Sequence, residues 1–442
     1  MSTRLHDDFA TIAARHVLAP WMAQGGPPPP TIVRGEGCYL YDADGKRYLD
    51  FSSGLVAVNL GHGHRGIADA ISEQARRLAF APPSLGNDQR AMLARAISEM
   101  SPWEEGGRVF FTTGGGEANE DAIKLARTLT GRHKVLTAYR SFHGSAPGAG
   151  TLSGENRRWP NEPGIAGVVR FFAPFPYRSP FFTRDPAEEC RRALAHLEEI
   201  VGYEAGDRIA ALLIEPVVGS NGVIVYPDGY LEGLRTLCDR YGILLIFDEV
   251  MTGFGRTGEA FAATRFGVVP DAFTFAKGVT SAYVPLGGVA LRETLAAHFD
   301  ARALPSGHTF SGHPVAMAAG IATITAYRQE RIFERARAME DELRARFEHL
   351  RRRHRVIGEV RGVGAFFGLE LVRDAQSREP LVPWQGTQTL APFFGDLLTR
   401  GLYAFGRYNT VVIAPPLIAG AAELDEAAAT FDAALDTLER GS

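Results

Sequence analysis

Short apolar runs alternate with helix-like segments from about residue 61 to residue 315, and this alternation limits the possible folds of the chain severely. The runs are RVFFTT, KVLTAY, GVVRFF, IAALLIEPVV, ILLIFDEV and DAFTFAK. Segments between them, such as EANEDAIKLARTL and GYLEGLRTLCDRYG, have the periodicity of amphipathic helices. Near-continuous apolar strands separated by helices indicate a mainly parallel sheet covered on both faces. The predicted fold class is therefore α/β.

The chain has 442 residues, more than one ordinary domain needs. Four prolines at 27–30 separate an N-terminal helix from CYLYDADGKRYLDF, which predicts a hairpin with its turn at Asp44-Gly45. After Pro314 an amphipathic helix leads into strands of a smaller α+β domain. We predict an N-terminal segment over 1–60 that packs with the small domain, a large domain over 61–315 and a C-terminal small domain over 316–442.

Composition argues against several classes of function. A formal net charge of −4 offers no field for capturing nucleic acid. The three cysteines, Cys38, Cys190 and Cys238, lie far apart, so they indicate neither a disulfide framework nor a clustered zinc site. We find no signal peptide and no apolar run long enough to span a bilayer. The expectation is a cytoplasmic protein without nucleic-acid or membrane partners.

The stretch LLIFDEVMTGFGRTGE places Asp248 and Glu249 at the end of an apolar strand, as in the Mg²⁺ sites of P-loop nucleotidases. Such a site also needs the string G-x-x-x-x-G-K-[ST] to hold phosphate, and the chain does not contain it. Nucleotide hydrolysis is therefore the less favoured interpretation of Asp248. Glu249 and the GFGRTG loop are interpreted as structural.

Two other motifs lie at strand ends. In FFTTGGGEANEDAIKLAR three glycines join a strand to a helix, and a helix N-terminus behind glycines can bind an anion. Lys277 closes the apolar run DAFTFAK. Alone, each motif fits an ordinary turn or an exposed lysine equally well. Together with Asp248 they provide the phosphate anchor, the amine and the acid partner that pyridoxal 5′-phosphate requires.

These residues, in this order, resemble the class III (ω-amino acid) pyridoxal-phosphate aminotransferases of fold type I. The resemblance runs from about His16 to Ile418 and includes GKRYLDFSSGL, LGHGH, FTTGGGEANEDAIKLAR, SFHG, IEPV, IFDEVMTGFGRTG, FAKG and HTFSGHP. It implies a large domain with a mainly parallel sheet, a smaller α+β domain, pyridoxal phosphate as cofactor, and a homodimer with shared active sites.

The resemblance also implies roles for individual residues. Lys277 would form the Schiff base, and Asp248 would pair with the pyridinium nitrogen. The remaining cofactor contacts would be Gly115 and Gly116 on the phosphate, Phe142 and Val250 on the two ring faces, Glu215 and His143 beside the ring, and Thr309 of the opposite subunit on the phosphate. His143 is expected to be a structural partner rather than a base. His62 and His64 in LGHGH are not expected to bind metal.

Three positions depart from the family's pattern; the first concerns the phosphate site, and the other two concern substrate recognition. Gly116 stands where many members have serine or threonine. Val56 stands where tryptophan is frequent, and Trp21 is a possible replacement wall. Phe405 stands where members often have an arginine that binds the keto acid's carboxylate; the preferred replacement is Arg407, and the alternatives are Arg157 and Arg158.

The predicted activity is transfer of an amino group from an ω-amino acid or amine, such as taurine or β-alanine, to a keto acid, with pyruvate preferred. Open alternatives are a 4-aminobutyrate or ornithine aminotransferase that uses 2-oxoglutarate, an aminomutase, or a decarboxylating transaminase. A hypothesis from another class is a catalytically silent binding protein. The presence of both Lys277 and Asp248 disfavours it.

Overall fold

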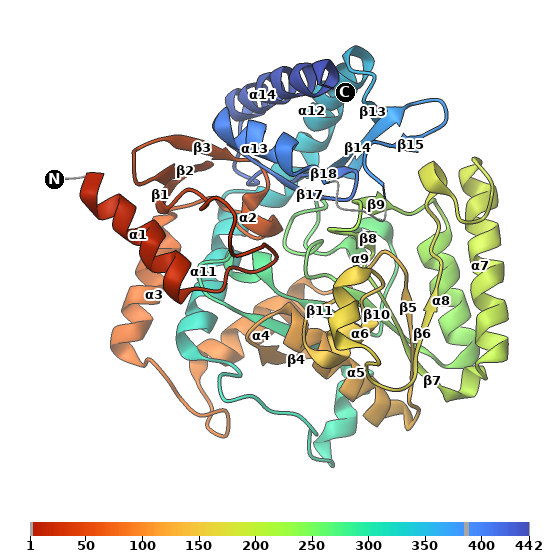
Figure 1. The fold of residues 1–442 in the computed structure, drawn as a ribbon. Helices are drawn as coiled ribbons and strands as arrows, with labels where there is room; N and C mark the ends of the chain where they lie inside the picture. Colours follow the sequence, from red (N-terminus) through yellow and green to blue (C-terminus); the bar gives the residue numbers. More distant parts are fainter. Residues whose placement is uncertain (1–2, 384–388, 442) are drawn as a thin grey trace.

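A computed structural model describes residues 3–383 and 389–441, and its centre is a seven-stranded sheet in the order β4-β12-β11-β10-β7-β5-β6 (Figure 1). The strands are β4 Gly107–Thr112, β5 Lys134–Ala138, β6 Val168–Phe171, β7 Ile209–Ile214, β10 Leu244–Asp248, β11 Ala272–Phe275 and β12 Gly287–Arg292. Neighbouring strands from β11 to β6 run parallel, whereas β12 is antiparallel to both β11 and β4. The predicted α/β class with a mainly parallel sheet is confirmed.

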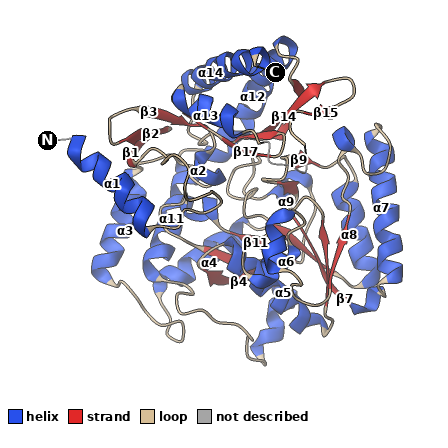
Figure 2. Ribbon diagram, in the orientation of Figure 1, coloured by secondary structure: helices blue, strands red, loops and turns tan. Residues whose placement is uncertain are grey.

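Helices cover both faces of this sheet (Figure 2). They are α3 Arg65–Arg77, α4 Asp88–Met100, α5 Gly115–Thr130, α6 Pro147–Leu152, α7 Pro186–Tyr203, α8 Tyr230–Tyr241, α9 Ala262–Phe266, α10 Glu293–Ala296 and α11 Pro314–Gln329. Successive side chains of β7 point to opposite faces: Ala211 and Leu213 join the cluster under α5, whereas Leu212 and Ile214 join the main core with α7 and α8. A strand buried on both faces has no polar alternation, which explains the continuous apolar run IAALLI.

Residues near the N-terminus form a second sheet with a strand from the far end of the chain. Helix α1 Thr3–His16 precedes β1 Ile32–Glu36, β2 Tyr39–Asp42 and β3 Arg47–Asp50, followed by α2 Ser53–Val56. The predicted hairpin is confirmed, because β2 and β3 pair antiparallel around the turn that contains Gly45. On its other edge β3 pairs parallel with β16 Leu402–Tyr403. The boundaries at 60/61 and 315/316 stay a prediction.

The C-terminal part packs long helices on a third sheet, whose strand order is β13-β14-β18-β17. Its elements are α12 Ile332–Arg353, β13 Ile357–Val363, β14 Phe366–Asp374, β15 Glu379–Pro380, α13 Ala391–Thr399, β17 Phe405–Arg407, β18 Thr410–Ile413 and α14 Ala421–Arg440. The periodic apolar residues of α12, from Ile332 to Leu350, are buried. None of the helices among the described residues combines the length and the apolar composition that a bilayer crossing requires.

The remaining elements are a short hairpin and several 3-10 helices. They are the hairpin β8 Val217–Val218 with β9 Ile224–Val225, and the 3-10 helices η1 Asn156–Asn161, η2 Pro176–Arg178, η3 Gly206–Arg208, η4 Lys277–Thr280 and η5 Ala297–Asp300. Helix η4 begins at Lys277, just after the end of β11.

Candidate active site

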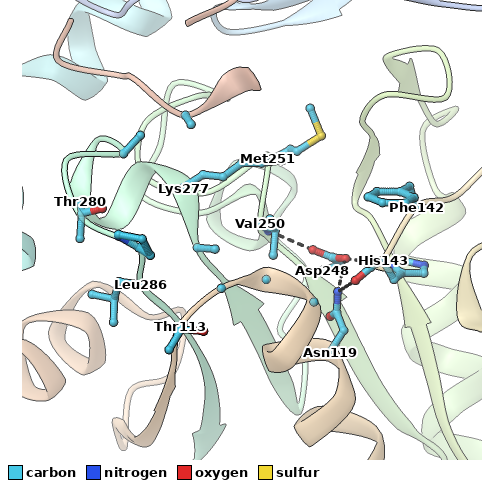
Figure 3. A pocket seen from close by; sticks show the side chains of 18 of the residues that line it. Thr113, Asn119, Phe142, His143, Asp248, Val250, Met251, Lys277, Thr280 and Leu286 are labelled. Carbon is cyan, nitrogen blue, oxygen red and sulfur yellow. Dashed lines mark hydrogen bonds and ion pairs between the residues drawn. The ribbon is translucent and has the colours of Figure 1, made fainter. Parts of the chain in front are cut away.

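A cavity of about 390 Å³ opens at the carboxyl ends of the parallel strands (Figure 3). Its lining comes from the turns after β4, β5, β7, β10 and β11, and includes Thr113, Gly114, Gly115, Gly116, Asn119, Phe142, His143, Glu215, Asp248, Val250, Met251 and Lys277. Ligands of open α/β sheets bind at this edge. The strand-end residues named from the sequence are therefore brought together in one place.

Asp248 is the last residue of β10, and three donors fix its carboxylate. Nδ2 of Asn119 donates to Oδ2 at 2.8 Å, and the backbone N–H of Val250 donates to Oδ1 at 3.0 Å. Nδ1 of His143 lies 2.7 Å from Oδ2. Figure 3 shows Asp248 between these partners at one end of the cavity. A buried carboxylate held in this way can accept a further hydrogen bond only from a fixed direction.

Asn119 is a site residue that the sequence patterns did not single out. It lies one turn into α5 and is 1% exposed. Besides Asp248, it donates to the backbone oxygen of His143 at 2.7 Å and accepts from Oγ1 of Thr274 at 2.8 Å. The available signal was its spacing: four residues after Gly115, its side chain returns to the helix face that meets the strand ends.

Lys277 occupies an unusual backbone position, with φ at +48° in the left-handed region. Such a conformation costs free energy for a residue with a Cβ and is found most often at functional sites. Burial lowers the pKa of its ammonium group to about 8; Arg157 lowers it further, whereas Asp248 and Glu215 act in the opposite direction. The amine is therefore a better nucleophile and base near neutral pH than a lysine in water.

The glycine turn at 114–116 forms the floor of the cavity. Helix α5 begins at Gly115 behind Gly114, whose position carries no side-chain cap. A Cβ at Gly115 would lie 2.8 and 2.9 Å from the methyl groups of Val250, so glycine is required there. The N-terminal N–H groups and the helix dipole favour an anion at this point.

Glu215 and His143 support the same end of the cavity. Glu215 accepts the backbone N–H of Phe142 at 3.0 Å and that of Gly219 at 2.7 Å. Burial raises the pKa of Glu215 to about 7; His143 acts in the opposite direction, and Asp248 adds to the increase. The backbone N–H of His143 donates to Oγ of Ser153 at 2.9 Å. These contacts hold the loop that presents Phe142.

The cavity thus presents an amine, a carboxylate and an anion-binding helix end, which match the aldehyde, ring nitrogen and phosphate of pyridoxal phosphate. Residues 22–435 match the family model for aminotransferase class-III. The chain is a class-III aminotransferase. It therefore has fold type I and uses pyridoxal phosphate.

Similar proteins support this membership over almost the whole chain. The structure of a taurine:2-oxoglutarate aminotransferase from Bifidobacterium kashiwanohense, in complex with PLP and glutamate, is similar with a TM-score of 0.96 and 41% identity over 98% of each chain. A probable aminotransferase of Mycobacterium tuberculosis is 37% identical over 90% of this chain and 87% of its own. The taurine–pyruvate aminotransferase of Bilophila wadsworthia is 33% identical over 93% of both chains.

Phe142 lies at the mouth of the aminotransferase's cavity and is covered by a cation. The guanidinium carbon of Arg157 lies 3.6 Å from the centre of the Phe142 ring. Trp21 meets the same ring edge-on at 6.2 Å between centroids, and it is 69% exposed. Trp21 therefore stands at the rim.

Glu155 is a second residue that the sequence patterns missed, and it holds two of the three candidate arginines. Its buried side chain pairs with both Arg157 and Arg407. Arg407 also donates to Asn156, and Nη2 of Arg157 donates to Oγ of Ser220 at 2.8 Å. Arg158 points elsewhere and pairs with Glu162 at 3.2 Å.

Val56 and Phe405 belong to one apolar cluster with Met251, which lines the cavity. Val56 is only 2% exposed, and its neighbour Ala57 lines the cavity instead. Thr309 is exposed between η5 and α11 and lies outside the cavity of its own chain. Its role across a subunit interface stays a prediction.

His62 and His64 each pair with a carboxylate. Nε2 of His62 lies 2.9 Å from Asp50, and Nε2 of His64 lies 3.0 Å from Glu330. Within residues 3–383 and 389–441, no three His, Cys, Asp or Glu side chains are grouped as a metal site would need.

Proposed function

We propose that Lys277 holds the cofactor covalently, that Asp248 pairs with its ring nitrogen, and that the N-terminus of α5 binds its phosphate. In this proposal Phe142 and Val250, which both line the cavity, pack against the two faces of the ring. When bound, pyridoxal phosphate supplies an electron sink for the carbon that bears the substrate amine. The contacts of Asp248 with Asn119 and His143 support this arrangement, since they direct its carboxylate into the cavity.

Nζ of Lys277 serves as the base in this proposal. It removes the proton from the carbon that bears the donor's amine, and it returns a proton when the keto acid is aminated. A pKa lowered to about 8 by burial leaves part of the amine neutral near physiological pH, as a base requires. Val250 and Phe142 exclude water from the two sides of the reacting group.

We infer that the donor is an ω-amino acid of the taurine or β-alanine kind and that the acceptor is a keto acid, with pyruvate preferred. The observation that carries this inference is the position of Arg157, whose guanidinium lies 3.6 Å over Phe142 and whose charge influences Lys277. Donor and acceptor both carry an anionic group, so one arginine at this place can bind each in turn. The names of the Bilophila and Bifidobacterium relatives, both taurine aminotransferases, support the donor; for the acceptor they differ, with pyruvate in the first name and 2-oxoglutarate in the second.

Arg407 was preferred from the sequence, but its contacts favour a supporting role. Both arginines pair with Glu155, but Arg407 is also held by Asn156, whereas Arg157 lies over the Phe142 ring at the cavity wall. A keto acid with a second carboxylate, such as 2-oxoglutarate, would need a second cation released from Glu155. This requirement supports pyruvate over 2-oxoglutarate.

Arg157→Gln tests the proposal, with Arg407→Gln as a matched control. Loss of one charge-assisted contact of about 1.5–3 kcal/mol should raise the KM for pyruvate and for taurine about tenfold or more. The half-reaction with propylamine, a donor that has no anionic group, should have the same rate in Arg157→Gln as in wild type. An unchanged KM for pyruvate in Arg157→Gln would show that Arg157 does not bind the substrate's anionic group. A raised KM in Arg407→Gln alone would show the same. The assay should pair taurine, β-alanine, 4-aminobutyrate and ornithine with pyruvate and with 2-oxoglutarate.

We further propose that the enzyme is a cytoplasmic homodimer in which Thr309 reaches the phosphate of the partner's cofactor. The exposed position of Thr309, next to Phe310 at 55% exposure, supports a contact with a second copy. Light scattering of the purified enzyme measures the assembly, and a monomeric mass in an active sample would contradict it.

A further inference from the structure

Residues 301–313, all within the described part of the chain, join η5 to α11 and include no helix or strand. We call them the Thr309 loop, because Thr309 lies exposed near its end. Loops that lack the hydrogen bonds of regular structure are more mobile than the elements they connect. Side-chain contacts must therefore determine where Thr309 lies.

Asp121 holds the part of the loop that precedes Thr309. It lies on α5 and is fully buried. Its Oδ1 accepts from Oγ of Ser306, and its Oδ2 lies 2.5 Å from Nε2 of His308. Nζ of Lys124 donates to Oδ1 of Asp121 at 3.2 Å and to Oγ of Ser306 at 2.9 Å. A buried carboxylate that loses its donors costs much free energy, so Ser306 and His308 are held firmly.

Strand β4 contacts the loop on both sides of Thr309. Oγ of Ser311 donates to the backbone oxygen of Phe111 at 2.8 Å. The ring of His308 packs on the ring of Phe110, with their centroids 5.8 Å apart. Thr309 therefore lies between two anchored residues, and its position follows from theirs.

The elements that hold the Thr309 loop also form the candidate phosphate site of their own subunit. Strand β4 leads through the glycine turn into α5, on which Asp121 lies less than two turns after Gly115. Thr309 itself lies outside this cavity. Its neighbour Phe310 is 55% exposed and meets the 42% exposed Phe80, with ring centroids 6.2 Å apart. An exposed apolar pair beside Thr309 fits a contact with a second copy of the chain.

We propose that Asp121 is a positioning residue for the cofactor of the partner subunit. Through Ser306 and His308 it holds Thr309 where the threonine hydroxyl meets the phosphate in the partner's site. The inference rests on the homodimer and on the role of Thr309 proposed above. Helix α5 then serves two sites, since its N-terminus binds the phosphate of its own subunit and its Asp121 acts on the partner's.

Titration of the apoenzyme with pyridoxal phosphate, followed by absorbance, tests this role. Thr309→Val should raise the Kd about tenfold, because a charge-assisted hydrogen bond is lost. Asp121→Ala should raise the Kd by no more than Thr309→Val does. The double variant Asp121→Ala/Thr309→Val should have the Kd of Thr309→Val alone, since Asp121 acts through Thr309. Additive losses in the double variant would overturn the proposal.

Two further variants separate positioning from stability. His308→Ala removes one contact of Asp121 at a side chain that is 27% exposed, so it replaces Asp121→Ala if that variant fails to fold. His354→Ala is the control, because His354 pairs with Asp432 at 2.7 Å in the C-terminal part of the chain. The control should lower the Tm without changing the Kd. An equal rise of the Kd in His354→Ala and His308→Ala would overturn the proposal.

Mixed dimers, prepared with two affinity tags, show in which subunit Asp121 acts. One subunit carries Lys277→Ala, so only the other gives the absorbance of lysine-bound cofactor. Asp121→Ala in the subunit with Lys277→Ala should raise the Kd of the intact site. Asp121→Ala in the subunit that keeps Lys277 should leave the Kd unchanged. The reverse pattern would place the effect of Asp121 within its own subunit and overturn the proposal.

Thr309→Val in the same mixed dimers tests the underlying assumption separately. An unchanged Kd with Thr309→Val in either subunit would reject the role of Thr309 and, with it, that of Asp121. A Kd raised by Thr309→Val in the subunit with Lys277→Ala, but not by Asp121→Ala or His308→Ala there, would reject the role of Asp121 alone.

Discussion

Gly115→Ala should weaken cofactor binding, whereas Gly116→Ala should leave it nearly unchanged. A Cβ at Gly115 would lie 2.8 Å from Cγ2 of Val250, so Val250 must move into the cavity. A Cβ at Gly116 would lie 3.6 Å from Cα of Gly144, which is an ordinary contact. Overpacking of this kind costs about 1–3 kcal/mol, which corresponds to about 5-fold to 160-fold in the Kd for pyridoxal phosphate.

Gly116→Ser should strengthen the binding of pyridoxal phosphate. The space beside Gly116 admits a Cβ, and a hydroxyl there would face the anion-binding end of α5. One hydrogen bond to a charged phosphate contributes about 1.5–3 kcal/mol, so Kd should fall about tenfold or more.

Titration of the apoenzyme with pyridoxal phosphate, followed by absorbance, measures these affinities. The double variant Gly115→Ala/Val250→Ala removes the methyl groups that clash; compared with Val250→Ala alone, which controls for the lost contact with the ring, it should recover most of the lost affinity. Equal losses in Gly115→Ala and Gly116→Ala, or no recovery in the double variant, would refute the steric argument.

Three further predictions concern the lysine, its supporting network and the buried arginine of the GFGRTG loop. Near pH 7 the free energy of unfolding of apoenzyme Lys277→Met should exceed that of wild type by up to about 3 kcal/mol, because burial lowers the pKa of Lys277 to about 8 against 10.5 for an unperturbed lysine. The variant should therefore unfold at a higher temperature. The buried charge costs stability fully below pH 8, and the cost fades as the pH rises from 8 to 10.5, so an advantage of the variant that persists at high pH would contradict the assignment. Asn119→Leu should lower kcat by about tenfold or more, because it leaves buried groups of Asp248 and Thr274 without their partner; single-turnover kinetics with the cofactor bound measures this, and an unchanged rate argues against the network. Arg256→Lys should lower the Tm by several degrees, since at least two buried acceptors lose a donor at about 1–3 kcal/mol each; scanning fluorimetry of the holoenzyme checks it, with the exposed Arg191→Lys as control.

Local sequence patterns predicted the strands well but not their order. All six apolar runs named from the sequence became strands of the large sheet. The seventh strand, β12, begins with Gly287 and Gly288 and was not predicted, because two glycines weaken the strand signal. Its antiparallel place between β4 and β11 is set by contacts distant in sequence.

The residues of the site also divide into those that local sequence predicts and those that depend on contacts distant in sequence. Lys277 and Asp248 could be named because each ends an apolar strand, and strand ends meet at one edge of a parallel sheet. Glu155 could not, because a carboxylate in a polar loop is usually solvated. Its burial against Arg157 and Arg407 exists only after β17 folds beside η1.

Arg256 shows how the loop interpreted as structural contributes to the site. Its fully buried guanidinium donates to the backbone oxygens of Ala365 at 2.9 Å and Pro415 at 2.7 Å, and to Oδ1 of Asn59 at 2.8 Å. The planar fork of arginine serves several acceptors in different directions, which the single ammonium group of lysine cannot do. Asn59 in turn lies so close to Gly278 that a Cβ there would be 2.6 Å from its Nδ2. Arg256 therefore connects N-terminal and C-terminal parts of the chain and fixes the backbone beside Lys277, so that packing far from the cavity sets the position of the reacting amine.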